Sequence, residues 1–204
     1  EDNQADNYSF NLFTPSEVHE YLRQEVRDFV QRNNLDKQAE HYDAEEKLNM
    51  DLFQQVAEQG WLGVTIPEEY GGMGLDTTAA VIVHHELSKS DPGFCLAYLA
   101  HSMLFVNNFF YCATEEQRER FLGPTLTGEW VAGMGMTEPN YGTDVLGMTT
   151  TAVRDGDTYI LNGTKTYITN GPEGHIFLVY AKVNGRITAF IVTRDCPGFS
   201  TSHH

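Results

Sequence analysis

The chain has 204 residues, of which 41% are hydrophobic, enough to bury a sizeable core in one or two domains. Its formal net charge is −16 at pH 7, because 29 acidic residues outnumber 13 lysines and arginines. So acidic a chain argues against nucleic acid or an anionic membrane as a partner, and no apolar run reaches the ~20 residues that span a bilayer.

Amphipathic helices are predicted in the first 60 residues. Residues 14–17 have the order of a capping box, with Pro15 at the first helical position, and apolar residues follow at helical spacing. Residues 36–48 are charged and are expected to be helical in part. Asn49 can cap a further helix that ends at Gly60.

A glycine-rich connection and a buried helix are expected next. Residues 61–75 contain several glycines, but the GxGxxG spacing of a dinucleotide-binding loop fails at its third glycine, which favours a structural turn. Asp76 is expected to cap a helix that ends near Ser88. Its run of apolar residues 79–83 is apolar on every face, which indicates a central, buried helix.

The most apolar helix of the chain is predicted to follow Asp91 and to end near Cys112. Its large apolar side chains are expected to pack in the core. Thr114 begins a second capping box, and the short helix after it is expected to end before the Gly-Pro pair at residues 123 and 124.

The histidines and cysteines do not predict a metal site. Cys95, Cys112 and Cys196 are scattered and odd in number, which favours buried free thiols in a reducing compartment. His84 and His85 are adjacent, and adjacent residues on a helix face different ways, so this pair is a poor metal site.

The hydrophobic period changes from 3.6 toward 2 at Trp130, which marks a domain boundary. An all-helical domain is therefore predicted for residues 1–129 and a β-domain for residues 130–204, which places the chain in the α+β class.

The β-domain is expected to contain a small antiparallel sheet. Its predicted strands are residues 149–153, 158–161, 176–183 and 186–193. Tight turns are expected at residues 155–156 and 162–163, and Asn184 with Gly185 predicts a type I′ hairpin turn.

Two polar turns, residues 136–144 and 167–172, end segments of this sheet. They present Thr137, Thr143 and Thr169, with neighbouring backbone amides, beside an aromatic ring. Short hydroxyls and free amides suit a flat, uncharged, hydrogen-bonding ring system. Spacing alone leaves the alternative of ordinary threonine-rich turns open. The chain contains no GxSxG motif, Walker loop or clustered catalytic set, which favours a bound cofactor as the source of any chemistry.

The same two turns resemble known sequence motifs. Residues 136–144 resemble the TEPxxGSD signature of the acyl-CoA dehydrogenases, and residues 161–171 resemble their LNGxKxWITNG run. The motifs stand in the family's order and at its separation, and residues 67–74 and 187–192 also fit. The resemblance covers nearly the whole chain and is strongest to isovaleryl-CoA and short-branched-chain members.

The resemblance implies a fold and a cofactor. The fold is a helical N-terminal domain, an antiparallel β-barrel-like middle domain, and a C-terminal four-helix bundle that is absent from this chain. The implied cofactor is FAD, bound by Met134, Met136, Thr137, Thr143, Tyr167, Ile168 and Thr169. Thr137 would donate to the pyrimidine end of the flavin and Thr169 would lie by its N5 edge, while Thr143 would contact the substrate thioester.

The implied reaction is FAD-dependent α,β-dehydrogenation of a short- or branched-chain acyl-CoA to the enoyl-CoA, with electrons passing to an electron-transfer flavoprotein. The resemblance also implies a homotetramer, in the cytoplasm of a bacterium or the mitochondrial matrix, without nucleic acid or membrane insertion. The catalytic base is expected in the C-terminal bundle. No catalytic residue is therefore assigned here, Glu138 is given a structural role, and the chain alone is expected to be inactive.

Departures from the family pattern leave alternatives open. Tyr167 stands where most members have tryptophan, Thr143 replaces a serine, and Tyr141 replaces a small residue. The hairpin at Asn184 is also shorter than in isovaleryl-type members. A flavin-fold relative with another reaction (an acyl-CoA oxidase, a reductase or a desulfinase) is one alternative, and a non-catalytic binding module of the same fold is another.

Overall fold

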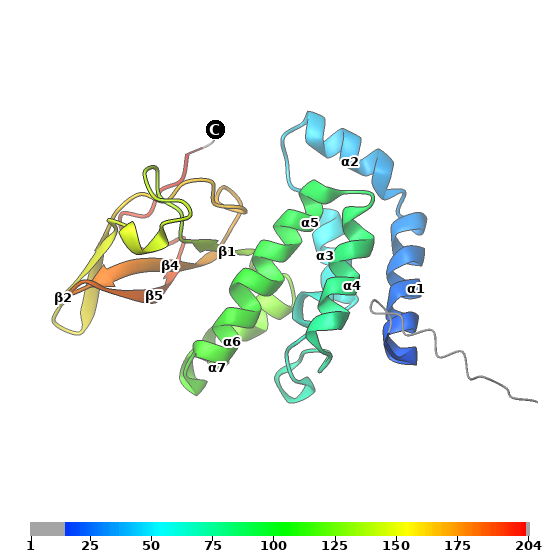
Figure 1. Ribbon diagram of the computed structural model, residues 1–204, viewed down its shortest axis with the longest axis horizontal. Coiled ribbons are helices and arrows are strands. Elements are labelled where there is room, and N and C mark those ends of the chain that lie inside the picture. The colour runs from blue at the N-terminus through cyan, green and yellow to red at the C-terminus, as the bar shows by residue number, and fades with distance from the viewer. Residues whose placement is uncertain (1–14, 203–204) are drawn as a thin grey trace, which may run out of the picture.

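A computed structural model describes residues 15–202, as a helical part followed by a five-stranded sheet (Figure 1). The α-helices are α1 (Glu17–Arg32), α2 (Leu35–Ala44), α3 (Met50–Glu58), α4 (Thr77–Ser88), α5 (Pro92–Leu99), α6 (Asn108–Cys112) and α7 (Glu115–Leu126). The strands are β1 (Ala132–Gly135), β2 (Thr151–Asp155), β3 (Thr158–Asn162), β4 (Ile176–Val183) and β5 (Arg186–Thr193). The element order supports the predicted α+β class.

Side-chain caps start most of these helices where the sequence predicts them. The side chains of Asn49, Asp76 and Asp91 each accept a hydrogen bond from a backbone N–H in the first turn of their helix. Thr114 forms a complete capping box with Gln117 at the start of α7. Each cap satisfies a donor that the first helical turn would otherwise leave unpaired.

The start of α1 differs from the prediction. Ser16 is the N-cap, its hydroxyl accepts from the N–H of His19, and Pro15 therefore precedes the helix. The expectation that Pro15 occupies the first helical position is wrong because Ser16 offers a capping hydroxyl two residues closer to the apolar run. Thr14, the cap predicted from sequence, lies outside the described residues.

The apolar helix predicted between residues 91 and 112 is one continuous helix with an unpredicted middle. A π-helical segment, Ala100–Asn107, joins α5 to α6. By length and composition alone this 21-residue helix could cross a membrane, which corrects the expectation that no apolar run is long enough. However, 61% of its most apolar window is buried inside the protein, which is the pattern of a core helix.

Helix α7 is longer than predicted. It continues through Gly123 and Pro124 to Leu126, so the expected stop before this pair is wrong. Pro124 removes one intrahelical donor. Its carbonyl still accepts from the N–H of Trp130, and the N–H of Thr127 still bonds to the carbonyl of Gly123. The helix can therefore end two residues beyond the proline.

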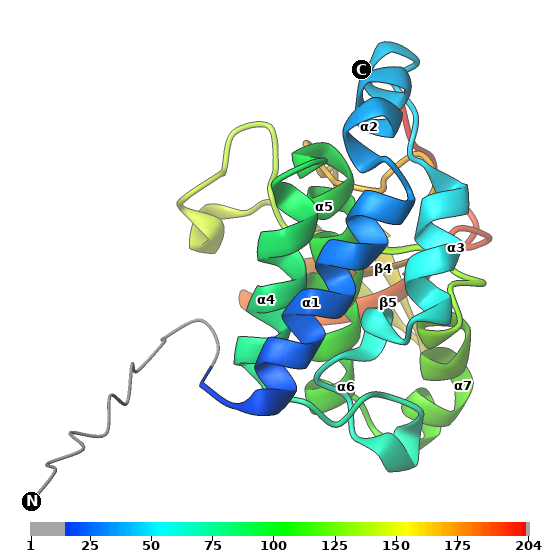
Figure 2. The same ribbon diagram turned by 90° about the vertical axis from the view of Figure 1, so that its right-hand side faces the viewer.

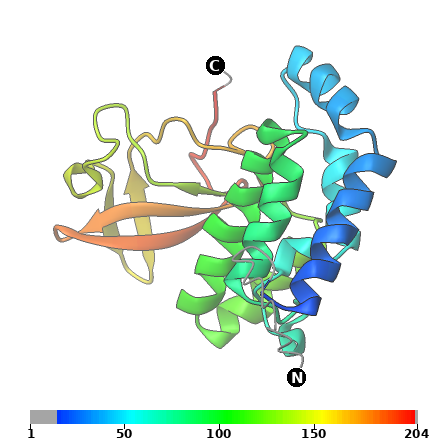
Figure 3. The ribbon, with the colours of Figure 1, turned by 45° about the vertical axis from the view of Figure 1, so that its right-hand side comes forward.

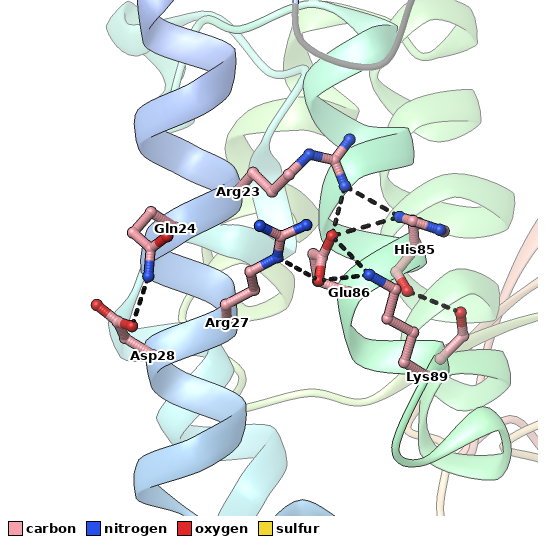
Figure 4. Close-up of polar contacts among 8 residues, drawn as sticks. Arg23, Gln24, Arg27, Asp28, His85, Glu86 and Lys89 are labelled. Atoms are coloured by element: carbon pink, nitrogen blue, oxygen red, sulfur yellow. Dashed lines mark hydrogen bonds and ion pairs between the residues drawn. The ribbon is translucent and has the colours of Figure 1, made fainter.

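Helices α1 and α4 are joined by a buried carboxylate (Figure 4). Glu86 of α4 is buried, and it pairs with Arg23 and with Arg27 Nε of α1, the latter at 3.1 Å, and with Lys89 Nζ at 3.0 Å. Burial raises the pKa of Glu86, but hydrogen bonds from Lys89, Arg23 and Arg27 outweigh burial and hold that pKa at about 2. Glu86 therefore remains a charged link between the two helices.

Helix α4 is less buried than its sequence suggests. Val81 is 52% exposed, so the expectation of a helix buried on every face holds for one side only. The buried side packs between α1 and α5, and Figure 2 shows these three helices in front of the sheet.

The sheet is mixed and open, which corrects the expected antiparallel, barrel-like arrangement. Strand β4 pairs parallel with β1 and, at one position, with β2, while the β2–β3 and β4–β5 pairs are antiparallel. The β4–β5 hairpin turns at Asn184 and Gly185, both with positive φ, as predicted. No turn closes at residues 162–163, because Asn162 is the last residue of β3 and pairs with Thr151.

The core has two parts. One lies among the helices, and the other lies where the sheet meets the long apolar helix and α7 (Figure 3). The second part joins Phe105 and Phe109 of that helix to Ala132 of β1 and to Ile176 and Leu178 of β4. Strand β1 also packs directly on the π-helical segment. Strand β1 is therefore held against the helical part of the molecule from its first residue.

Candidate functional site

The two segments that carry the sequence motifs, residues 136–144 and 161–171, are brought together in space. Lys165 Nζ donates to the carbonyl of Met136 at 3.0 Å and to Glu138 Oε1 at 2.9 Å. The backbone N–H of Thr166 donates to the carbonyl of Thr137 at 2.9 Å. The run after β1 and the run after β3 thus form one surface, although about 30 residues separate them in the chain.

Glu138 is the buried anchor of this surface. Its Oε2 accepts from the N–H of Thr149 at 2.6 Å and from the Thr149 hydroxyl at 2.8 Å. Its Oε1 accepts from the N–H of Thr150 at 2.9 Å as well as from Lys165. Burial raises the pKa of Glu138, but these donors from Thr150, Lys165 and Thr149 outweigh burial and hold the pKa well below its usual range. A carboxylate with this many donors holds its turn in place and is a poor proton acceptor.

Three threonines project hydroxyls that the fold itself does not use. Within residues 15–202, the hydroxyls of Thr137, Thr143 and Thr169 make no hydrogen bond, and the backbone N–H groups of Thr137 and Thr169 have no acceptor. Thr143 is exposed, and the other two are half-buried. By contrast, the hydroxyl of Thr149 is bonded to Glu138. The structure therefore supports free donors at the predicted positions of both turns.

Tyr167 stands on the second turn in an uncommon conformation. Its φ is 56°, in the left-handed region that bulky residues rarely adopt, and its side chain is 93% exposed. An exposed aromatic ring held at a strained position is a common feature of ligand-binding surfaces. The Tyr167 ring is therefore exposed to solvent and accessible for stacking on a flat ligand.

The second turn is packed closely against β1. A Cβ atom added at Gly133 would lie 2.8 Å from the carbonyl oxygen of Thr169, so only glycine allows this approach. Ile168, the residue before Thr169, is half-buried. Met134 and Met136 are also half-buried, and Met134 packs against the core that joins the sheet to the helices.

Two buried residues that the sequence analysis did not assign to the site join it to the helices. Asn170 donates from its amide nitrogen to the carbonyls of Ala97 and Ala132, both at 2.9 Å. His101 accepts from the N–H of Ala132 at 3.0 Å through Nδ1 and donates to the carbonyl of Thr125 at 2.8 Å through Nε2. Two sequence signals could have indicated these residues: a polar histidine inside an apolar helix, and an asparagine within a motif turn.

The histidines of α4 have structural partners in the described part of the chain. No group of three or more histidines, cysteines or acidic residues that could hold a metal ion occurs in residues 15–202. His84 donates to the carbonyl of Ala80, and His85 lies beside Arg23 and Glu86.

The cysteine thiols are unpaired, but they are less buried than expected. Burial raises the pKa of Cys95 to about 11, which makes it an unreactive thiol. Cys112 and Cys196 are exposed, so the expectation of buried thiols is wrong for these two.

A hollow of about 720 Å³ opens on the sheet beside the β4–β5 hairpin. Arg154 of β2 and Lys182 of β4 line it, together with Tyr159 and Asn184. This is a cationic surface on a chain with a large negative net charge.

Comparison with known proteins assigns both parts of the chain. The family model for the acyl-CoA dehydrogenase N-terminal domain matches residues 16–129, and that for the acyl-CoA dehydrogenase middle domain matches residues 133–204. The mitochondrial isovaleryl-CoA dehydrogenase of Pongo abelii is 40% identical over 195 residues, which cover 92% of this chain and 46% of that protein. The chain thus spans about half the length of the curated relatives it matches.

Solved structures agree with this assignment. A glutaryl-CoA dehydrogenase of Mycobacterium smegmatis in complex with FADH2 has a TM-score of 0.86 and 30% identity, over 91% of this chain and 47% of that chain. A chain in a structure of the electron transferring flavoprotein of Acidaminococcus fermentans has a TM-score of 0.85 and 34% identity, over 95% of this chain and 51% of that chain.

Proposed function

This chain belongs to the acyl-CoA dehydrogenase family, and from that premise we propose that it forms the flavin- and acyl-binding part of a dehydrogenase. The substrate we propose is a short- or branched-chain acyl-CoA thioester, which becomes the enoyl-CoA. The observation that carries this proposal is that Lys165 joins the two motif segments. On these segments, threonine hydroxyls make no hydrogen bond within residues 15–202, and the Tyr167 ring is exposed. We also propose that a helical domain, residues 1–129, and a sheet domain, residues 130–204, divide this work.

The residues of the two turns fit a bound FAD. An isoalloxazine is flat, apolar on its faces and rich in hydrogen-bond acceptors along one edge. The unpaired N–H groups and hydroxyls of Thr137 and Thr169 supply donors, and Tyr167 supplies an aromatic face. The residues that would hold the cofactor are Met134, Met136, Thr137, Thr143, Tyr167, Ile168 and Thr169.

When bound, the flavin supplies the redox chemistry by accepting a hydride equivalent. The chain's own contribution is binding and orientation. The hydroxyl and backbone N–H of Thr137 are hydrogen-bond donors, and such donors stabilise negative charge on a ligand bound against them. The hydroxyl of Thr143, on the same turn, is exposed and would hold a thioester carbonyl near the ring.

The long apolar helix offers a surface for the acyl chain of the substrate. Its π-helical segment, Ala100–Asn107, packs on β1, which leads directly into the first turn. A hydrocarbon chain lying on that helix would be shielded from water. The anionic part of coenzyme A would find Arg154 and Lys182 in the hollow on the sheet.

The residues described here do not supply an obvious base. Glu138 lies in the first turn, but its hydrogen-bond donors keep the carboxylate ionised and use both of its oxygens. We therefore propose that the 204-residue chain binds flavin and does not by itself turn over an acyl-CoA. Turnover by the purified 204-residue chain would contradict this part of the proposal.

Partners and location follow from the family. We propose an electron-transfer flavoprotein as electron acceptor, a homotetramer as the whole protein's assembly, and a bacterial cytoplasm or mitochondrial matrix as its location. The match to a chain in an electron transferring flavoprotein structure supports the proposed electron acceptor, and the match to a mitochondrial isovaleryl-CoA dehydrogenase supports the proposed matrix location.

The test is an absorbance spectrum of the whole protein during titration with a panel of acyl-CoAs, without oxygen. Bleaching of the flavin by a short- or branched-chain member supports both reaction and substrate class. A flavin that stays oxidised with every member rejects the dehydrogenase and also the oxidase, because an oxidase reduces its flavin with the same substrate, and leaves a reductase or desulfinase. A protein without a flavin spectrum rejects the cofactor and leaves the non-catalytic binding module.

A further inference from the structure

One residue of β1 is hydrogen-bonded by side chains from both sides of the molecule. The N–H of Ala132 donates to His101 Nδ1 at 3.0 Å, and the carbonyl of Ala132 accepts from Asn170 Nδ2 at 2.9 Å. All three residues are buried. Ala132 begins the strand that leads into the first turn, and Asn170 directly follows Thr169 on the second turn.

His101 can make these contacts only as a neutral ring. Its Nε2 donates to the carbonyl of Thr125 while its Nδ1 accepts from Ala132, which fixes a single tautomer. Burial lowers the pKa of His101 to about 4, so the ring stays neutral at ordinary pH. The ring therefore links three elements at one point: the π-helical segment, the end of α7 and the start of β1.

Asn170 continues the link to the second turn. It has a φ of 64°, and its second amide hydrogen reaches the carbonyl of Ala97 at 2.9 Å, in α5. Its neighbour Thr169 has its carbonyl packed against Gly133, where a Cβ would lie 2.8 Å away. Thus the same short stretch of β1 is held to α5 and to the turn that carries Thr169.

We infer that His101 and Asn170 are positioning residues, which fix the Thr169 turn relative to the helix that would cover the acyl chain. This inference rests on the proposed function. A hydride passes between a substrate carbon and a ring only when the reacting atoms are held about 3–3.5 Å apart, so a small shift between the two surfaces is costly. The two side chains hold that spacing because they bond the helical part and the sheet to the same residue, Ala132.

The π-helical segment fits this role. A π-turn admits an extra residue and occurs often at functional sites. Here it begins at Ala100, and His101 is its second residue. The widened turn lies where the ring of His101 leaves the helix for β1.

The test compares Asn170→Gly and His101→Gln with a matched control, Tyr98→Phe. Asn170→Gly keeps the positive φ and removes the two donated bonds together with the buried side chain that makes them. In His101→Gln a flexible amide, whose acceptor and donor lie further from the main chain, replaces the rigid ring, and we expect it to lose at least one of the two bonds. Tyr98→Phe removes a buried bond of the same helix, from the Tyr98 hydroxyl to the carbonyl of Trp61, which stays inside the helical part.

The first measurement is amide hydrogen exchange in the 204-residue chain, which does not depend on flavin. Asn170→Gly is expected to speed exchange about tenfold in β1 and at residues 168–171, with little change in α1 and α4, because loss of buried hydrogen bonds opens the structure locally. Tyr98→Phe is expected to leave these two segments unchanged. Exchange that rises equally everywhere, or that does not rise in β1, would overturn the inference.

The second measurement is binding of FAD by quenching of its fluorescence. Both site variants are expected to weaken FAD binding about tenfold relative to Tyr98→Phe at matched stability. Equal FAD affinity in all variants contradicts the positioning role. Failure of the unsubstituted chain to bind FAD rejects the proposed cofactor instead, and the exchange measurement then still decides whether the two residues hold the turn. If His101→Gln does not fold, Asn170→Gly alone decides both outcomes.

Discussion

Lys165 lies 2.9 Å from Glu138 across the two motif turns, and both side chains are nearly excluded from water. The lysine also donates to the carbonyl of Met136, so one ammonium group binds two points of the first turn. A buried pair of this kind gives little net stability against an apolar replacement, but its geometry fixes which surfaces meet. We interpret it as the link that turns two separate motifs into one binding surface.

Removal of this lysine should therefore uncouple the turns. We expect Lys165→Met to lower the free energy of unfolding by about 2–3 kcal/mol, because Glu138 stays buried and charged with only three remaining donors. The measurement is urea denaturation followed by circular dichroism. Lys182→Met, at a half-exposed position on β4, should change stability by no more than about 0.5 kcal/mol. Equal effects of the two substitutions would contradict the role of the buried pair.

Acid should destabilise the protein through two buried carboxylates whose pKa is lowered, Glu86 and Glu138. The pKa of Glu86 is about 2 in the folded chain, against 4.5 for a free glutamate, and that of Glu138 is also lowered. Since the unfolded chain binds these protons at higher pH, the stability that both groups contribute is complete above pH 4.5 and is lost as pH falls toward 2. The urea midpoint should fall steeply across this window.

A substitution identifies the source of this loss. Glu86→Gln should lower stability at pH 7, because three cations then lose their buried partner, and it should flatten the fall between pH 4.5 and 2. Glu119→Gln, on the exposed surface of α7, should leave the profile as it was. An unchanged slope in Glu86→Gln would show that other groups dominate acid unfolding.

Local chemistry made much of the fold predictable. The caps at Asn49, Asp76, Asp91 and Thr114 depend on residues within one helical turn, so the sequence states them directly. The hairpin at Asn184 is local in the same way, because asparagine followed by glycine favours positive φ at both positions.

Contacts between distant segments were not predictable in the same way. The parallel pairing of β1 with β4 joins residues more than 40 positions apart, and alternation along a strand does not specify its neighbour. The extension of α7 through Pro124 also depends on context, because the later helical bonds outweigh the one that proline removes. For the site, sequence motifs marked the turns, whereas His101 and Asn170 act through partners that only the fold brings near.

The strained conformation of Tyr167 predicts a trade between stability and binding. We expect Tyr167→Gly to be as stable as the parent or up to about 1 kcal/mol more stable, because glycine adopts a φ of 56° without strain. The same change should weaken FAD binding about tenfold, since it removes the exposed ring. Asn184→Gly, at another positive φ far from the turns in sequence, should leave FAD affinity unchanged. Tight FAD binding by Tyr167→Gly would exclude the ring as a contact.

Threonine hydroxyls with and without partners should separate binding from folding. The hydroxyls of Thr137 and Thr169 make no hydrogen bond within the described chain, whereas that of Thr149 donates to Glu138 at 2.8 Å. We therefore expect Thr137→Val and Thr169→Val to change the free energy of unfolding by less than about 0.5 kcal/mol and to weaken FAD binding about tenfold.

Thr149→Val should show the opposite pattern. Loss of its bond to a buried carboxylate should cost about 1–2 kcal/mol of stability. Under conditions where every variant is fully folded, Thr149→Val should bind FAD as tightly as the parent chain. Urea denaturation and fluorescence titration on the same preparations measure both quantities. Thr137→Val and Thr169→Val could instead destabilise the chain as much as Thr149→Val and bind FAD normally. Their hydroxyls would then stabilise the fold, and they would not be the donors that contact the flavin.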